Sequence, residues 1–174
     1  MGIRRSRRPV AAARLDDAAR RLLDASTLCA ISTVSPRSIA HVHTAYFAWD
    51  EELRLVWLSD PDAGHSRNIR ARPTTAVAVY GPEQRWGRPD RGVQLFGRAR
   101  ELAGPEAADA EGVYAQRFAA YRSGALADFR FYRFAAGRAK LFDEAVFGDG
   151  VFITARIQGG TLVWDRTEIS AGGT

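Results

Sequence analysis

The sequence predicts a mainly β protein, a β-barrel with a few helices. Seven or eight short segments rich in β-branched and aromatic residues follow one another, separated by Gly, Pro, Asp and Ser turns. Helical periodicity interrupts this series in two or three places. With 174 residues the chain is long enough to bury a core. Sequential short strands in a small domain favour a barrel, because closure removes exposed sheet edges.

The first part of the chain predicts one helix followed by an antiparallel meander. Residues 15–25 place their apolar side chains on one helical stripe. The period then changes to that of strands, which we expect at 28–34, 39–49 and 53–59. The turn sequences SPR and DEE separate these three strands, so neighbouring strands are expected to pair.

The rest of the chain predicts further strands broken by a short helix and a long one. A polar loop is expected at 81–91, which is rich in Gly, Pro and charged residues. Gly97, inside a predicted strand, indicates a bulge or a close approach of two backbones. The remaining predicted elements are helices at 64–70 and 105–121 and strands at 76–80, 92–101, 129–142, 151–157 and 161–164.

The charge distribution predicts a disordered basic tail over residues 1–13 and a single domain over residues 14–174. Four of the first eight residues are arginine, so the net charge of +5 falls to +1 when these four are removed. Phosphates attract such a tail weakly. No aromatic residues are interleaved with its arginines to stack on bases, so we expect no nucleic-acid partner.

Two absences and one cysteine bear on location and redox state. No run approaches the roughly 18 apolar residues of a membrane span, and charged residues interrupt the N-terminal segment where an export signal has its apolar centre. We therefore expect a cytoplasmic protein without a membrane partner. Cys29 is the one cysteine, which excludes an intramolecular disulfide, and its strand context predicts burial.

The three histidines, His41, His43 and His65, leave several uses open. His41 and His43 are two apart on a predicted strand and face the same side. That spacing suits a metal or haem site, a ligand cavity, or a solvent-facing strand. No cysteine or carboxylate ligand stands beside them, so we expect no metal. Nucleophile-elbow, P-loop and dinucleotide-binding glycine motifs are absent, so the catalytic residues stay unknown.

The turn after the third predicted strand concentrates groups that bind anions. Ser59 and Ser66 offer hydroxyls, Arg67 offers a guanidinium, and His65 offers a ring N–H. The N-terminus of the helix that follows adds unpaired backbone N–H groups and a partial positive charge, which together suit a phosphate. The alternative is a plain strand, turn and helix in which residues such as Asp62 only cap the helix.

Several segments together resemble the pyridoxamine 5'-phosphate oxidase-like superfamily of FMN-binding split barrels, in particular its small uncharacterised flavoproteins. LVWLSDPDAGHSRNIRARPTTAVAVY is similar to the strand, phosphate turn, helix and strand of that superfamily. HVHTAYFAWDEE resembles the strand under the flavin ring, GVQLFGRAREL a later strand, and FRFYRFAAGRAKLFD the closing strand. The resemblance covers about residues 15–164. It implies a split β-barrel that forms a homodimer with flavin sites at the interface.

The resemblance also implies which residues bind FMN. His43, Thr44 and Ala45 would run along the edge of the isoalloxazine ring. Gln94 would reach that ring from the partner subunit. The residues implied for the ribityl and phosphate region are Leu58, Ser59, His65, Ser66, Arg67 and Asn68.

Two departures from the superfamily pattern shape the functional expectation. A phosphate-binding position that is often lysine is His65 here, and a histidine is only partly charged near neutral pH. The C-terminal arginine and histidine signature of true pyridoxamine-phosphate oxidases has no counterpart, so we do not expect vitamin B6 oxidation. We expect an FMN-binding flavoprotein, a flavin-dependent oxidoreductase acting on an unidentified small molecule. The alternative is a non-catalytic barrel that binds flavin, deazaflavin or haem, and FMN is favoured over FAD, deazaflavin and haem.

Overall fold

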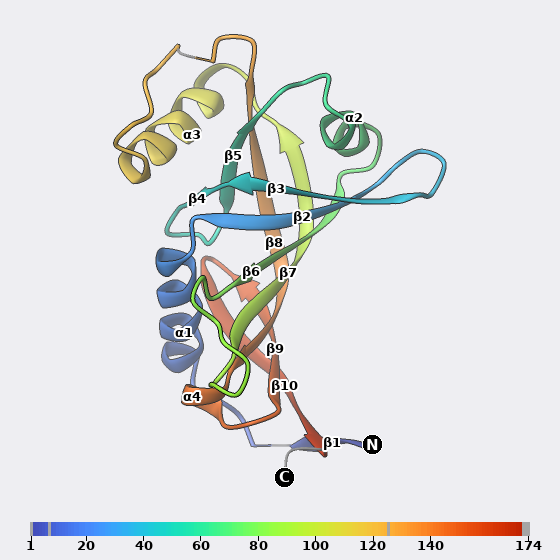
Figure 1. The fold of residues 1–174 in the computed structure, drawn as a ribbon, viewed down its shortest axis with the longest axis vertical. Helices are drawn as coiled ribbons and strands as arrows, with labels where there is room; N and C mark the ends of the chain where they lie inside the picture. The colour runs from blue at the N-terminus through green and yellow to red at the C-terminus, as the bar shows by residue number, and fades with distance from the viewer. Residues whose placement is uncertain (1, 7, 125, 172–174) are drawn as a thin grey trace. The chain divides into compact units, whose positions relative to one another are not determined.

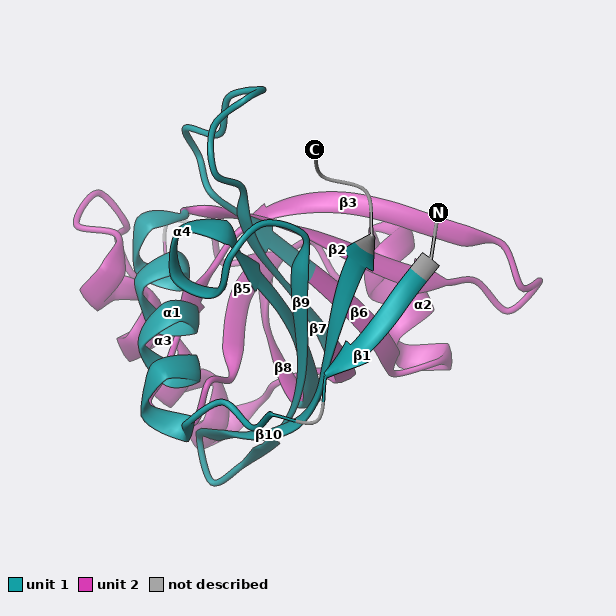
Figure 2. Cartoon of the chain, turned by 90° about the horizontal axis from the view of Figure 1, so that it is seen from below, with its two compact units in different colours: residues 1–26, 78–95, 137–174 teal, residues 27–77, 96–136 magenta. Residues whose placement is uncertain are grey.

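Antiparallel strands dominate the computed structural model, which describes residues 2–6, 8–124 and 126–171 (Figure 1). The expected mainly β class is confirmed. The chain divides into two compact units, each of which is described by itself (Figure 2). Unit 1 comprises residues 1–26, 78–95 and 137–174, and unit 2 comprises residues 27–77 and 96–136.

The hydrogen-bonded strands follow the order β1-β10-β9-β8-β7-β6-β2-β3, and β5 pairs with β4 and β8. Three strands, β6, β7 and β8, contribute residues to both units. In the described part of the chain no helix combines the length and apolar character needed to cross a membrane. The elements are β1 (Gly2–Ser6), α1 (Ala12–Ala25), β2 (Leu28–Val34), β3 (Ala40–Tyr46), β4 (Ala48–Trp49), β5 (Leu55–Ser59), α2 (Gly64–Ala71), β6 (Thr74–Tyr80), β7 (Arg91–Glu101), α3 (Gly104–Arg117), β8 (Arg130–Asp143), α4 (Glu144–Phe147), β9 (Val151–Gln158) and β10 (Thr161–Ala171).

In unit 1, helix α1 packs on the β9–β10 hairpin. Its apolar stripe, which includes Leu15 and Leu22, is buried. Two polar contacts fix its position: the Asp16 carboxylate accepts the backbone N–H of Leu162 at 2.7 Å, and the Arg20 guanidinium donates to the backbone carbonyl of Gly160 at 2.9 Å. The hairpin turn therefore meets the helix at defined backbone atoms.

Unit 2 is built around the pairing of β2 with β3 and of β5 with β8. Trp57 of β5 and Tyr132 of β8 are fully buried cross-strand neighbours with stacked rings, 5.8 Å between centroids. Gly97 of β7 lies against β8, where a Cβ atom would come within 2.0 Å of the carbonyl oxygen of Ala135. The close approach predicted at this glycine is confirmed.

The N-terminal segment differs from the predicted tail. Residues 2–6 form strand β1, which pairs antiparallel with β10, and helix α1 already begins at Ala12. Residues 1 and 7 lie outside the described residues. The single domain expected over residues 14–174 stays a prediction.

Most predicted elements are confirmed, with differences at their ends. The strand expected at 39–49 is interrupted at Phe47, whose side chain is fully buried and whose N–H donates to the Thr27 carbonyl. Helix α3 ends at Arg117, before the predicted 121, and β10 continues past 164 after a bulge to Ala171. The burial predicted for Cys29 is confirmed.

We predict that Gly97→Ala lowers the free energy of unfolding by about 3 kcal/mol, because the new methyl group has no space beside the Ala135 carbonyl. Urea denaturation measures this change. Gly137→Ala is the matched control, since this strand glycine is exposed with nothing near its Cβ position. Equal stability of the two variants would contradict the close approach.

Candidate functional site

The end of β5 and the first turn of α2 bring three of the predicted site residues into contact in unit 2. Ser59 is the last residue of β5, and its Oγ lies 2.5 Å from Nε2 of His65 in α2. The His65 ring stacks on the ring of His43 from β3, with 3.5 Å between centroids and 14° between planes. Three separate elements thus meet at two imidazoles and one hydroxyl.

Buried polar side chains hold α2 in this position. The Ser66 hydroxyl donates to the backbone carbonyl of Asp60 at 2.7 Å, which closes the turn. The Asn68 side-chain amide donates to the Thr33 hydroxyl of β2 at 3.1 Å. Both Ser66 and Asn68 are buried. Both side chains therefore contact the protein, and the expectation that they approach a phosphate stays a prediction.

The N-terminus of α2 presents free backbone donors. Its first helical hydrogen bond runs from the Arg67 N–H to the Ala63 carbonyl at 3.0 Å, so the N–H groups of Gly64, His65 and Ser66 have no acceptor within the helix. No side chain caps this helix, although the plain-turn alternative assigned that part to residues such as Asp62. Its amides are therefore available to an anion.

The other predicted residues differ in exposure. The Arg67 side chain is exposed, and its guanidinium donates to the Asp62 carbonyl. Thr44 is exposed on β3, while Ala45 and Leu58 are partly buried. Gln94 is exposed on β7 and belongs to unit 1. A part for these residues in binding a cofactor stays a prediction.

Burial keeps both imidazoles of the cluster neutral near pH 7. Desolvation, with a smaller contribution from His65, lowers the pKa of His43 to about 4. Desolvation also lowers the pKa of His65, against an opposing effect of the Asp60 charge. Both ring nitrogens of His43 are buried and have no hydrogen-bond partner among the described residues. Such atoms carry a desolvation cost that a ligand in hydrogen-bond reach would remove.

A hydrogen-bond network that the sequence did not indicate supports the turn between β5 and α2. The Tyr132 hydroxyl donates to the Glu101 carboxylate at 3.0 Å, and the Arg70 guanidinium donates to the same carboxylate at 2.9 Å and to the Pro61 carbonyl at 2.8 Å. These residues are distant in sequence, so no local pattern joins them. The Tyr132 and Phe131 side chains are themselves buried.

The family model described as Pyridoxamine 5'-phosphate oxidase matches residues 15–143. None of the functionally curated proteins matches the chain. Solved structures with similar folds include a haem-binding protein from Mycobacterium smegmatis, at 19% identity and a TM-score of 0.69, with 89% of this chain and 61% of that chain covered. The chain thus spans about three fifths of that protein.

Two further similar structures cover most of their own chains. They are the haem storage protein HutZ of Vibrio cholerae (18% identity, TM-score 0.62, 71% of this chain and 90% of that one) and an FAD-binding protein of Mesorhizobium loti (21% identity, TM-score 0.58, 82% and 99%). At these identities the likeness shows the fold, which is the split barrel expected from the sequence motifs.

We predict that the neutral His43 makes unfolding pH-dependent. Its folded pKa of about 4 lies below the 6.5 of a free histidine, so the unfolded chain binds protons first as pH falls. The contribution of His43 is complete above about pH 6.5 and is lost progressively down to about pH 4. Urea unfolding of His43→Phe should show a weaker loss of stability across this window than the wild type.

His41→Gln is the control for that comparison, because the exposed His41 side chain lies on the same strand. An NMR titration of the His43 ring gives an independent measurement. A midpoint near that of free histidine would contradict the buried, neutral ring.

Proposed function

The chain belongs to the pyridoxamine 5'-phosphate oxidase family, and we propose that it is an FMN-binding flavoprotein that acts as an oxidoreductase on a small molecule. One observation carries this proposal. The two unpartnered nitrogens of His43 lie in one cluster with the uncapped N-terminus of α2, which His65 links to β3. The cluster thus offers donors both to a polar ring and to a phosphate.

The phosphate would bind at the first turn of α2. Because desolvation disfavours charge on the His65 ring, the main attraction would come from the backbone N–H groups of Gly64, His65 and Ser66 and from the helix dipole. Arg67 is exposed and adds a guanidinium, and Ser59 adds a hydroxyl. Ser66 and Asn68 would act by holding the turn in place through their buried side chains.

The ring system of the cofactor would lie along β3. A neutral His43 has one N–H donor and one nitrogen acceptor, which suits the alternating donors and acceptors of a flavin edge. Thr44 and Ala45 follow it on the strand, and the partly buried Leu58 would keep water away. The bound flavin would supply hydride or electron transfer. The residues of this chain would orient it and exclude water, and we assign no acid or base.

Haem is the second candidate, and His43 is also the observation that favours it. A neutral imidazole with an unpartnered nitrogen is the form that ligates iron. Two of the similar structures are of proteins described as haem-binding and haem storage proteins, and a third as an FAD-binding protein. The same cluster therefore supports a non-catalytic haem-binding or flavin-binding protein as the alternative.

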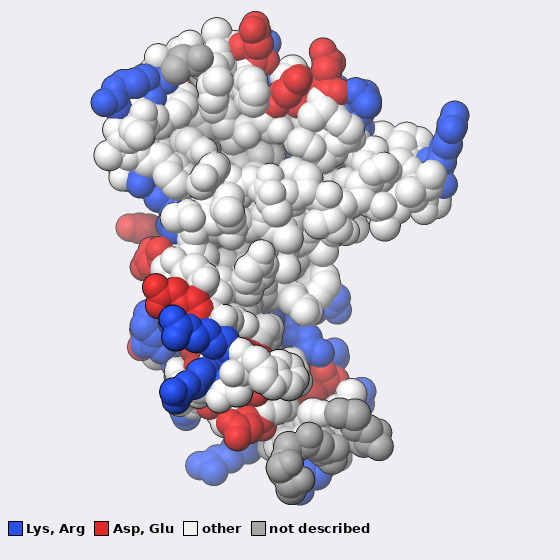
Figure 3. Space-filling view, in the orientation of Figure 1, with Lys and Arg blue, Asp and Glu red and all other residues white. Residues whose placement is uncertain are grey.

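We also propose that a second copy of the chain covers β3, with the cofactor sites at the shared interface. Among the described strands β3 pairs only with β2, so its outer backbone edge is open. Val42 is 71% exposed and Tyr46 58% exposed, and Ile39 and Leu28 beside them are exposed too. Figure 3 shows that the surface over β2 and β3 is almost free of charged side chains. Open, apolar strand edges of this kind bind other chains.

For the dimer we expect Val42→Lys to convert the protein to a monomer, because a buried lysine at the interface is costly to desolvate. Analytical ultracentrifugation of the wild type and the variant measures the change. Leu126→Lys, at an exposed apolar residue outside β3, should leave the mass unchanged. A wild type that sediments as a monomer would refute the proposed dimer.

For the cofactor we expect purified protein mixed with FMN to retain it through dialysis and to show flavin absorption bands. The double substitution Ser59→Ala with Arg67→Ala should weaken FMN binding about tenfold through the lost phosphate contacts. Riboflavin lacks the phosphate, so its affinity should change little. Fluorescence quenching of the flavin gives both affinities.

Arg122→Ala serves as the charge-matched control, since the Arg122 guanidinium donates to the neighbouring backbone carbonyls of Ala119 and Tyr121. Equal losses for FMN and riboflavin would show that the α2 turn does not bind the phosphate. A strong Soret band after addition of haem, lost in His43→Leu, with no retained FMN would replace the flavin proposal by the haem alternative.

A further inference from the structure

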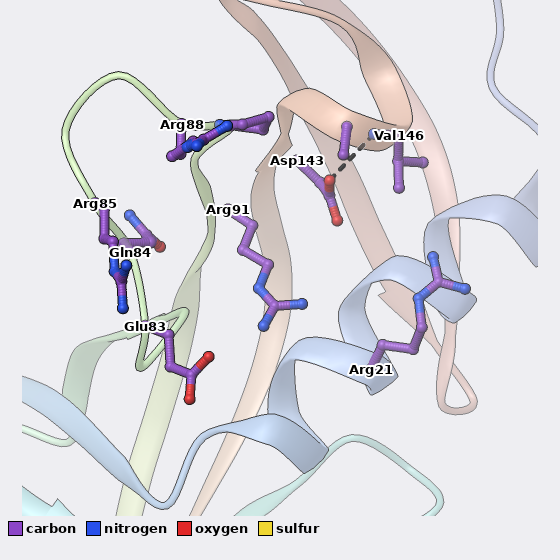
Figure 4. Close-up of a pocket in the computed structure, with 10 residues that line it drawn as sticks. Arg21, Glu83, Gln84, Arg85, Arg88, Arg91, Asp143 and Val146 are labelled. Carbon is purple, nitrogen blue, oxygen red and sulfur yellow. Dashed lines mark hydrogen bonds between the residues drawn. The ribbon is translucent and has the colours of Figure 1, made fainter.

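Unit 1 contains a cavity of about 500 Å³ that is separate from the residues discussed above. The loop between β6 and β7, the start of β7, helix α1 and helix α4 supply its walls (Figure 4). Its charged lining consists of four arginines and two carboxylates, namely Arg21, Arg85, Arg88, Arg91, Glu83 and Asp143. A cavity of this size matches those that enclose small-molecule ligands.

The backbone around Gly81 positions one of these arginines. The Gly81 N–H donates to the Arg91 carbonyl at 3.1 Å and lies 2.9 Å from the side-chain oxygen of Gln84. A Cβ on residue 81 would come within 2.9 Å of Nε of Arg91. The missing side chain thus leaves room for the Arg91 stem, which extends into the cavity toward α1 in Figure 4.

Asp143 of the lining and its neighbour Glu144 accept hydrogen bonds from backbone amides. Asp143 accepts the Val146 N–H at 3.1 Å, which caps α4. Glu144 accepts the N–H of Asp90 at 3.0 Å and that of Gly150 at 3.4 Å. Their hydrogen bonds therefore fix the loop and the helix.

The arginines of the cavity form few ion pairs with the protein. Within the described residues Arg85, Arg88 and Arg91 form no ion pair at 4.0 Å or less. Arg21 reaches Asp17 only at 4.0 Å, between exposed side chains, and such pairs contribute little. Three arginines that line one cavity and form no ion pair with the described residues favour an anion.

We propose that this cavity binds a nucleoside polyphosphate. Guanidinium groups match phosphate oxygens in pairs of parallel hydrogen bonds, and three of them suit more than one phosphate group. Trp86 follows Arg85 in the same loop, and its fully exposed side chain offers a flat face on which a base would stack. Glu83 also lines this cavity, and its negative charge opposes the binding of an anion.

Titration calorimetry with ATP and with inorganic pyrophosphate tests this site. We expect Arg88→Ala and Arg91→Ala to weaken both ligands about tenfold each. Glu83→Gln should strengthen both, because it removes the opposing charge. Trp86→Ala should weaken ATP and leave pyrophosphate unchanged, since only ATP carries a base.

Arg156→Ala is the matched control, at an exposed arginine of unit 1 outside the cavity. The proposal would be overturned if neither ligand binds, or if the substitutions of Arg88, Arg91 and Glu83 leave both affinities unchanged. An equal loss of affinity for ATP and for pyrophosphate in Trp86→Ala would overturn the assignment of a nucleoside. The proposal does not rest on the flavin, and FMN-loaded protein should bind ATP as tightly as protein without FMN.

Discussion

The candidate site of unit 2 depends on how the N-terminus of α2 is fixed to the sheet. The Asn68 side-chain amide donates a hydrogen bond to the Thr33 hydroxyl of β2, and the Ser66 hydroxyl donates one to the Asp60 carbonyl. Both groups are buried, and a buried polar group left without a partner costs about 1–3 kcal/mol. These contacts therefore allow few alternative positions for the helix. The stacking of His65 on His43, and the direction of the free amides, follow from that position.

The sequence predicted most elements because their signals are local. Apolar periodicity located α1 and β2, and Gly97 indicated a close approach that the Ala135 carbonyl explains. The errors arose where distant residues decide. Phe47 interrupts its strand to bury a ring and to bond to Thr27, and β1 exists through pairing with β10. The sequence next to Phe47 or β1 does not indicate either of these contacts.

The candidate site shows the same division. Residue chemistry predicted an anion site at Ser59, His65 and the α2 N-terminus, and the structure places these groups next to one another and to His43. Residue chemistry did not predict that the polar groups of Ser66 and Asn68 form buried hydrogen bonds with the protein. A hydroxyl or amide suits a contact with the protein or with a ligand, and the sequence does not decide between them. The arginine cavity was missed because its lining comes from three segments that are distant in the sequence.

The open edge of β3 has a consequence for the solubility of this protein. Natural sheets usually guard such an edge with lysine, proline or a bulge, and β3, with the sequence AHVHTAY, contains neither lysine nor proline. The whole chain has one lysine, Lys140, and it lies on β8. The chain therefore exposes unpaired backbone groups along β3, which can form hydrogen bonds with strands of other chains in solution. Protein concentration and crowding would then decide how often such edges of different copies meet and whether the protein precipitates.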